Sequence, residues 1–165
     1  MSASAADNWA RRFIRRTAAT RPVSKLYART LHHVDRRVYD ATDGRTTFTS
    51  WAAGVPVVML TTTGAKSGKR RTLPVLGFVE GDDVVVIASN FGQRHHPAWY
   101  HNLRANPRAT IVLDGRTTEV EAGMVTGAER EPHFERAIAT YPGFAAYSRR
   151  AGREIPIVRL SPARE

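Results

Sequence analysis

Short runs of β-branched and apolar residues, separated by turn residues, fill the chain after Thr46 and constrain its fold more than any other feature. Two tight turns, Glu80–Asp83 and Asp114–Gly115, separate neighbouring runs and predict β-hairpins. Hairpins in series give an antiparallel sheet, and six strands in a chain of 165 residues predict a closed or nearly closed barrel. The six predicted strands are Val57–Thr61, Val75–Val79, Val84–Ser89, Thr110–Leu113, Thr117–Val125 and Ile155–Leu160.

Two predicted helices interrupt these strands, so the expected fold class is mainly β with helices (α+β). The first helix covers 97–105, with proline at its N-terminus and an Asn-Pro pair after its end. The second covers 128–140 and ends at a Tyr-Pro-Gly turn. We therefore expect residues 46–165 to form one barrel domain with helices packed outside it.

A basic helical arm is predicted over residues 1–45, with helices at 8–17 and 24–39. From Asp7 to Arg45 the arm holds ten Lys or Arg residues against four Asp or Glu residues. Two interpretations stay open. The arm packs on the domain and exposes its arginines to solvent, or its first helix lies on an anionic membrane surface with Trp9 and Phe13 inserted.

The charge of the chain favours an anionic partner. Lys and Arg number 25 against 15 Asp and Glu, a formal net charge of +10. Nucleic acid, acidic lipid and a phosphorylated cofactor all fit this charge, but the aromatic residues lie mostly in apolar contexts, which argues against nucleic acid. Without cysteine, a secretory signal or an apolar run of about 20 residues, we expect a cytoplasmic protein.

The strongest local signal is a glycine-rich, basic segment at Thr61–Thr72, predicted to be a loop directly after a strand. Glycines let backbone N–H groups converge on an oxyanion, and the cations supply its counter-charge. The segment is not the phosphate loop of nucleotide hydrolases, because three residues rather than four separate its glycines. It predicts an anion-binding loop of another kind, and a solvated basic hairpin tip is the alternative.

Two further segments carry candidate site residues. Ala88–Leu103 leads from a strand through a polar loop into a helix, where Trp99 offers a face for a flat ring or a core contact. His95, His96 and His101 lack the supporting ligands of a zinc site, so no metal is expected, and His96 is expected to donate hydrogen bonds to loop backbone. Tyr141–Tyr147 brings three aromatic residues after a turn, as a pocket wall or simply as core.

Taken together and in this order, these segments resemble the deazaflavin-dependent nitroreductase family, F420-using relatives of the FMN-binding split-barrel proteins. The resemblance covers roughly residues 55–160. It rests on Thr-Thr-Gly-x-Lys-Ser-Gly-x-x-Arg-Thr-x-Pro at 62–74 and on His-Pro-x-Trp-Tyr-x-Asn-Leu-x-Ala-Asn-Pro at 96–107. It implies a split β-barrel that uses coenzyme F420 to transfer a hydride to a hydrophobic acceptor such as a quinone or a nitro or enone compound.

The resemblance also implies roles for individual residues. The F420 phosphate would be held by Lys66, Ser67, Gly68 and Arg71, and its glutamates by Lys69 and Arg70. The residues implied beside or near the deazaflavin are Thr72, Leu73, Pro74, Ala88, Ser89, Asn90, His96, Pro97, Ala98 and Trp99. Tyr141, Tyr147 and Ser89 are the implied catalytic residues, and Phe144 and Trp51 line the implied acceptor pocket. Phe144 stands where nitroreducing relatives place tyrosine, which favours quinones over nitroaromatic acceptors.

Alternatives remain open at this point. A related barrel would bind FMN with the same loop, since FMN also combines a planar ring and a phosphate. A non-catalytic F420 or lipid binder is a third possibility. The resemblance further suggests a homodimer, and the basic arm suggests peripheral contact with the inner face of the cell membrane.

Overall fold

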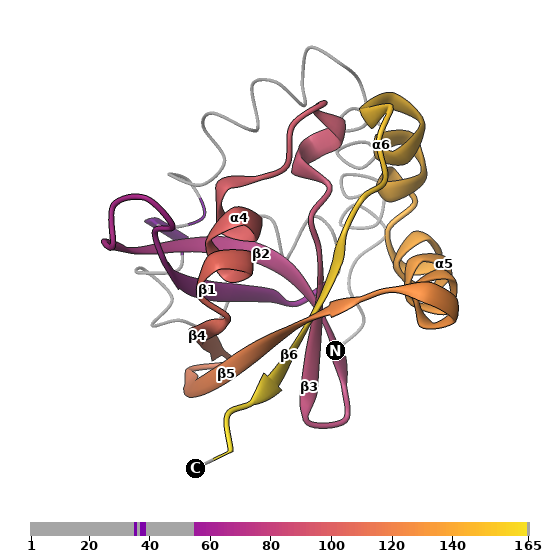
Figure 1. Cartoon of the computed structure of the whole chain (residues 1–165). Coiled ribbons are helices and arrows are strands. Elements are labelled where there is room, and N and C mark those ends of the chain that lie inside the picture. Colours follow the sequence, from indigo (N-terminus) through magenta and orange to yellow (C-terminus); the bar gives the residue numbers. More distant parts are fainter. Residues whose placement is uncertain (1–34, 36, 39–54, 165) are drawn as a thin grey trace.

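Six antiparallel strands close into a barrel in the computed structural model, which describes residues 35, 37–38 and 55–164 (Figure 1). The order around the barrel is β1-β2-β3-β6-β5-β4, and β4 pairs back onto β1. The predicted antiparallel barrel is therefore confirmed. Its strands are β1 Val57–Thr63, β2 Arg70–Glu80, β3 Asp83–Ile87, β4 Arg108–Leu113, β5 Arg116–Val125 and β6 Ile157–Pro162.

Both predicted hairpin turns are present. Glu80 pairs with Asp83 at the turn between β2 and β3. Between β4 and β5, Asp114 and Gly115 have φ values of 50° and 77°. A type I′ turn needs positive φ at both central residues, so the Asp-Gly pair suits this hairpin.

Most strand ends differ from the prediction by one or two residues: β1 ends at Thr63, β3 ends at Ile87 rather than at Ser89, and β4 begins at Arg108. The starts of β2 and β6 differ as well. β2 begins at Arg70 rather than at Val75, because residues 70–72 pair with 61–63 of β1 through the backbone despite their polar side chains. The predicted loop at Thr61–Thr72 therefore shrinks to residues 64–69. β6 begins at Ile157, two residues later than predicted, where its pairing with β3 and β5 begins.

Within residues 55–164, three α-helices lie outside the barrel: α4 Ala98–Ala105, α5 Arg130–Thr140 and α6 Gly143–Ala151. The first two confirm the predicted helices, although residues 127–129 form a 3₁₀ turn before α5. A second 3₁₀ turn covers 90–92. The sequence did not predict α6, which follows α5 after a short Tyr-Pro link. In Figure 1, α4 lies on one side of the barrel, and α5 and α6 lie on the other.

The core has two parts because both faces of the sheet are covered. Alternate residues of β3 show this: Val84 and Val86 belong to the cluster inside the barrel, whereas Val85 and Ile87 belong to the cluster under α5 and α6. A strand that is buried on both faces needs apolar side chains at every position, which explains why the sequence of β3 is a continuous apolar run. Trp99 of α4 joins the inner cluster.

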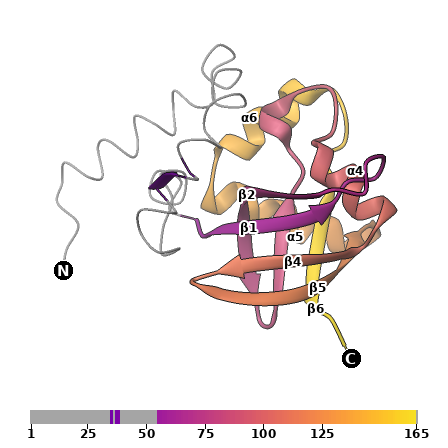
Figure 2. The ribbon, with the colours of Figure 1, turned by 90° about the vertical axis from the view of Figure 1, so that its left-hand side faces the viewer.

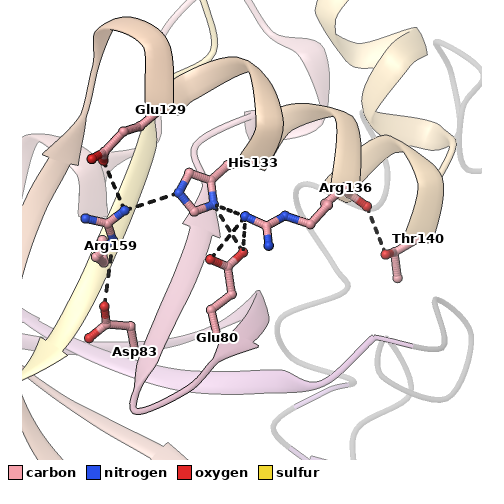
Figure 3. A network of polar contacts seen from close by, with 7 residues as sticks. All are labelled: Glu80, Asp83, Glu129, His133, Arg136, Thr140 and Arg159. Atoms are coloured by element: carbon pink, nitrogen blue, oxygen red, sulfur yellow. Dashed lines mark hydrogen bonds and ion pairs between the residues drawn. The ribbon is translucent and has the colours of Figure 1, made fainter.

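A polar network fastens α5 to the barrel (Figure 3). His133 is buried on α5, with Nδ1 3.1 Å from Glu80 Oε1 and Nε2 3.2 Å from Arg159 Nη2. Because a guanidinium only donates, Nε2 accepts from Arg159. Nδ1 lies 3.1 Å both from Glu80 Oε1 and from Nη2 of Arg136. Arg136 forms an ion pair with Glu80, and Glu129 forms one with Arg159. The network connects α5 with β2 and β6 by charge as well as by packing.

Most of the predicted arm lies outside the described residues, and Trp51 lies outside them too. Asp35, Arg37 and Val38 are helical, inside the helix predicted at 24–39. Asp35 is buried.

Candidate functional site

The β1–β2 loop, residues 64–69, is a tight basic turn. Gly64 N–H donates to the Lys69 carbonyl at 2.9 Å, and Gly68 N–H donates to the Gly64 carbonyl at 2.8 Å. A Cβ on Gly64 would lie 2.5 Å from Ser67 Oγ, and Gly68 has a φ of +64°. Gly68 therefore suits its backbone conformation, and a side chain at Gly64 would require the Ser67 hydroxyl to move.

Asn102 ties this loop to α4. Its Oδ1 accepts from Ala65 N–H at 3.0 Å, and its Nδ2 donates to Thr62 Oγ1 at 3.0 Å. Asn102 is 8% exposed and Thr62 is 1% exposed, so water does not easily replace the bond between their side chains. Figure 2 shows α4 and the β1–β2 loop at the same end of the barrel.

The loop has N–H donors without acceptors and positive side chains without acidic partners in the described part of the chain. Among the described residues, no acceptor faces the N–H groups of Lys66 and Ser67, and no carboxylate pairs with the side chains of Lys66, Lys69 or Arg71. By contrast, Arg159 has two acidic partners. Concentrated positive charge beside unpaired amides is the chemistry of an anion site, and a phosphate fits it.

The loop after β3, residues 88–95, has an unusual backbone. Asn90, Phe91 and Gly92 have φ values of 47°, 54° and 73° in succession. The left-handed conformation costs roughly 1–2 kcal/mol for a residue with a side chain, so this loop needs stabilising contacts. One of them is internal, since Asn90 Nδ2 donates to the His95 carbonyl at 3.1 Å. A Cβ on Gly92 would lie 3.0 Å from the backbone of Tyr147, because the loop packs closely on α6.

Two arginines supply such contacts. Arg153, after α6, donates to the carbonyls of Ala88, Ser89, Gln93 and His95 at 3.1–3.3 Å. Arg150 of α6 donates to the Phe91 carbonyl. Burial lowers the pKa of Arg153 from its ordinary value.

His95, His96 and His101 make individual contacts instead of gathering into one metal-binding cluster in the described part of the chain. Among the described residues, no group of three or more His, Cys, Asp or Glu side chains is arranged to hold a metal ion. The expected hydrogen bonds from His96 to loop backbone are absent at Nδ1, which is buried without a partner in the described structure. His95 instead contacts the backbone, with Nδ1 3.2 Å from the His96 carbonyl. Burial, followed by the charge of Arg153, lowers the pKa of His96 below 6.5.

The three aromatic residues after α5 form a buried group rather than an open wall. Phe144 is 2% exposed, and its ring meets those of Tyr141 and Tyr147 edge to face. The two tyrosine hydroxyls lie 3.3 Å apart and hydrogen-bond to each other. The roles predicted for these residues toward an acceptor stay predictions.

The structure brings the first two predicted segments together. Ala88 and Trp99 share the inner cluster, and Leu73 packs against it. Trp99 is buried, so most of its ring serves the core, while Ala98 at the start of α4 is exposed. The Phe91 and Tyr147 rings, 6.1 Å apart, connect the 88–95 loop with the aromatic group.

Three residues important to this geometry escaped the sequence-based prediction of roles. Asn102 lies within the second motif, but its partners are nearly 40 residues away in sequence. Arg150 and Arg153 donate to backbone carbonyls, and because every residue has a carbonyl, such contacts cannot be predicted from residue types. The available signal was a group of basic residues at the end of α6 and just after it, Arg149, Arg150 and Arg153.

Comparisons with known proteins agree with this arrangement. The model of the family described as F420H(2)-dependent quinone reductase matches residues 31–162. The F420H(2)-dependent quinone reductase Rv1261c of Mycobacterium tuberculosis is 32% identical over 111 residues, covering 64% of this chain and 73% of that protein.

Two solved structures share the fold. An F420-H2 dependent reductase, FDR-A, has a TM-score of 0.60 and 36% identity, covering 64% of this chain and 94% of that chain. A structure described as a domain-swapped dimer has a TM-score of 0.62 and 30% identity, covering 86% of this chain and 100% of that chain.

Proposed function

This chain belongs to the F420H(2)-dependent quinone reductase family, and we propose that it transfers a hydride from reduced F420 to a membrane-derived quinone. It is an F420-dependent oxidoreductase, and its cofactor is coenzyme F420. The family membership favours F420 over the FMN alternative. Beyond the family and the cofactor, the proposal names the acceptor and assigns roles to individual residues.

The observation that carries the proposal is the unneutralised charge of the β1–β2 loop. F420 carries a phosphodiester and a glutamate tail, so its distal half is anionic. Lys66 and Arg71, together with the N–H groups of Lys66 and Ser67, would bind the phosphate. Lys69 and Arg70 would face the glutamates. Arg70 already donates to Thr110 Oγ1 at 2.9 Å, which limits its reach.

The ring end of the coenzyme would lie between β2 and the 88–95 loop. Thr72, Leu73 and Pro74 are next along β2 from the phosphate loop and are partly or fully exposed. Ala88, Ser89 and Asn90 follow β3, and Leu73 and Ala88 belong to one cluster. These segments would orient the ring and exclude water from one face of it.

When bound, reduced F420 supplies two electrons as a hydride. The chain's own residues would position the acceptor and settle a proton on it. Tyr141 and Tyr147 are the proposed groups, because their paired hydroxyls can relay a proton within the aromatic group. Ser89 beside the ring is the third proposed participant, with Phe144 and Trp51 as pocket residues.

A quinone of the membrane suits the basic arm at residues 1–45, whose cations would meet anionic lipid at the inner face of the cell membrane. In the described part of the chain, no helix is long and apolar enough to cross a membrane. A homodimer is also proposed, because one similar structure is described as a domain-swapped dimer.

Parallel fluorescence titrations with F420 and FMN test the cofactor and the loop together. We expect F420 to bind and FMN not to bind. Lys66→Gln should weaken F420 binding by roughly tenfold to a hundredfold, the value of a hydrogen bond to a charged group. Arg116→Gln removes the same charge at the opposite end of the β1–β4 pair and should leave binding unchanged.

Turnover of reduced F420 by a soluble quinone then tests the enzymatic role. Failure of the unaltered protein to bind F420 would overturn the proposal, and equal losses for both charge variants would mean that net charge, not the loop, attracts the coenzyme. Binding without turnover by any quinone would favour the non-catalytic binder.

A further inference from the structure

The conformation of the 88–95 loop depends on arginines outside the loop as well as on one side-chain bond within it, from Asn90 Nδ2 to the His95 carbonyl at 3.1 Å. Gly92 tolerates a positive φ and gives the close approach to α6, but Asn90 and Phe91 carry side chains and have φ values of 47° and 54°. Two successive non-glycine residues adopt this conformation only where surrounding contacts over-determine it. The contacts that hold the loop are therefore as important as its own sequence.

Arg153 makes most of those contacts with a single side chain. Its Nη2 lies 3.3 Å from the carbonyls of Ala88 and Ser89, where the loop begins, and 3.1 Å from that of His95, where it ends. Its Nε donates to the Gln93 carbonyl at 3.1 Å. The guanidinium thus fastens both ends of the loop at one point.

Only arginine offers this geometry. A planar guanidinium presents five donors in a fixed fork, whereas a lysine ammonium is a single point of charge at the end of a flexible stem. Arg149, four residues earlier in the sequence, is exposed on α6 and contacts none of the loop carbonyls. The two arginines therefore form a natural test pair.

We propose that Arg153 is a positioning residue that fixes the 88–95 loop and thereby the surface on which the deazaflavin ring rests. This inference rests on the proposed function. Arg153 acts through the backbone of Ala88, Ser89 and the residues that follow. It makes no contact with the β1–β2 loop, so it controls the ring end of the coenzyme site and not the phosphate end.

Measuring the binding of two ligands distinguishes an effect on the ring end of the coenzyme site from an effect on the phosphate end. F420 and a deazaflavin lacking the phosphate and glutamates share the ring but not the anionic tail. Arg153→Lys should weaken binding of both by the same factor, about tenfold. Lys66→Gln should weaken F420 alone, and Arg149→Lys should change neither. If Arg153→Lys binds both ligands like the unaltered protein, or weakens F420 alone, the proposal is wrong.

Amide hydrogen exchange on the coenzyme-free protein tests the same residue without any ligand. The N–H groups of Gly92 and Gln93 donate to the carbonyls of Ser89 and Asn90 within the loop. In Arg153→Lys we expect these amides to exchange at least about tenfold faster while the β3 amides stay protected. Unchanged exchange in the loop would overturn the proposal.

Two safeguards keep the outcomes separate. Arg153→Gln is made alongside, so that a variant that fails to fold does not leave the question open, and thermal unfolding identifies which variants are folded. If the unaltered protein binds neither ligand, the proposed function fails, while the exchange data still decide whether Arg153 holds the loop.

Discussion

Replacing Asn102 with alanine should both destabilise the barrel and loosen the basic loop. The substitution removes two hydrogen bonds, to Thr62 Oγ1 and to Ala65 N–H. Ala65 is exposed, so water can satisfy its N–H, but the Thr62 hydroxyl is buried and loses its partner. A hydrogen bond contributes about 1 kcal/mol, and an unsatisfied buried group costs about 1–3 kcal/mol, so we expect a loss of about 2–3 kcal/mol.

Urea unfolding at 25 °C measures this loss, and the melting temperature should fall by roughly 5–10 °C for a chain of this size. Asn106→Ala is the matched control, because it makes the same change just after α4 at a side chain for which the described structure shows no hydrogen bond. It should cost less than about 0.5 kcal/mol.

A double-mutant cycle with Thr62→Val tests the reasoning itself. Valine keeps the shape of threonine but cannot form the bond to Asn102. If the two side chains stabilise each other, the double variant is more stable than the sum of the single losses predicts, by about 1–2 kcal/mol. Losses that add to within about 0.5 kcal/mol would refute the hydrogen-bond explanation.

Two further predictions concern the barrel and its pH dependence. Gly77→Ala should cost about 1–3 kcal/mol, because its Cβ would lie 2.5 Å from Val58 Cγ2 and 2.9 Å from Val84 Cγ1, whereas Gly123→Ala meets nothing within 4 Å and should be neutral in the same urea assay. Burial lowers the pKa of His96 below 6.5, so the unfolded chain takes up this proton first and stability is lost as the pH falls below 6.5. His96→Gln should flatten that decline in unfolding free energy between pH 7.5 and 5.5, and parallel curves would contradict the assignment.

The sequence predicted the sheet well where side chains report their surroundings. β3 has an apolar run because both of its faces are covered, and the Asp114-Gly115 pair marks a turn that needs positive φ. The start of β2 was wrong because Arg70 and Arg71 pair through the backbone, which their exposed side chains do not reveal. The helix α6 was missed because a Pro-Gly pair at its start is more typical of a turn.

The candidate site was predictable where its character depends on residue types. Charge and glycine in the β1–β2 loop are visible in the sequence, and so is the aromatic character of Tyr141–Tyr147. The sequence does not show that the tyrosine hydroxyls pair with each other, or that Arg153 reaches carbonyls about 60 residues away. Such contacts depend on tertiary structure and on backbone atoms that every residue shares.

The closed ring of strands has a consequence for self-association. Each of the six strands has a hydrogen-bonded neighbour on both sides, but the two neighbours can pair with different parts of the strand: β2 pairs with β1 over residues 70–76 and with β3 over residues 77–80. Among the described strands none lies wholly at an edge of the sheet, so a second molecule finds no full-length free strand to pair with, which disfavours fibrous growth by edge-to-edge templating. Such a barrel favours self-association through side-chain surfaces or by exchange of a whole segment of chain over association by strand pairing.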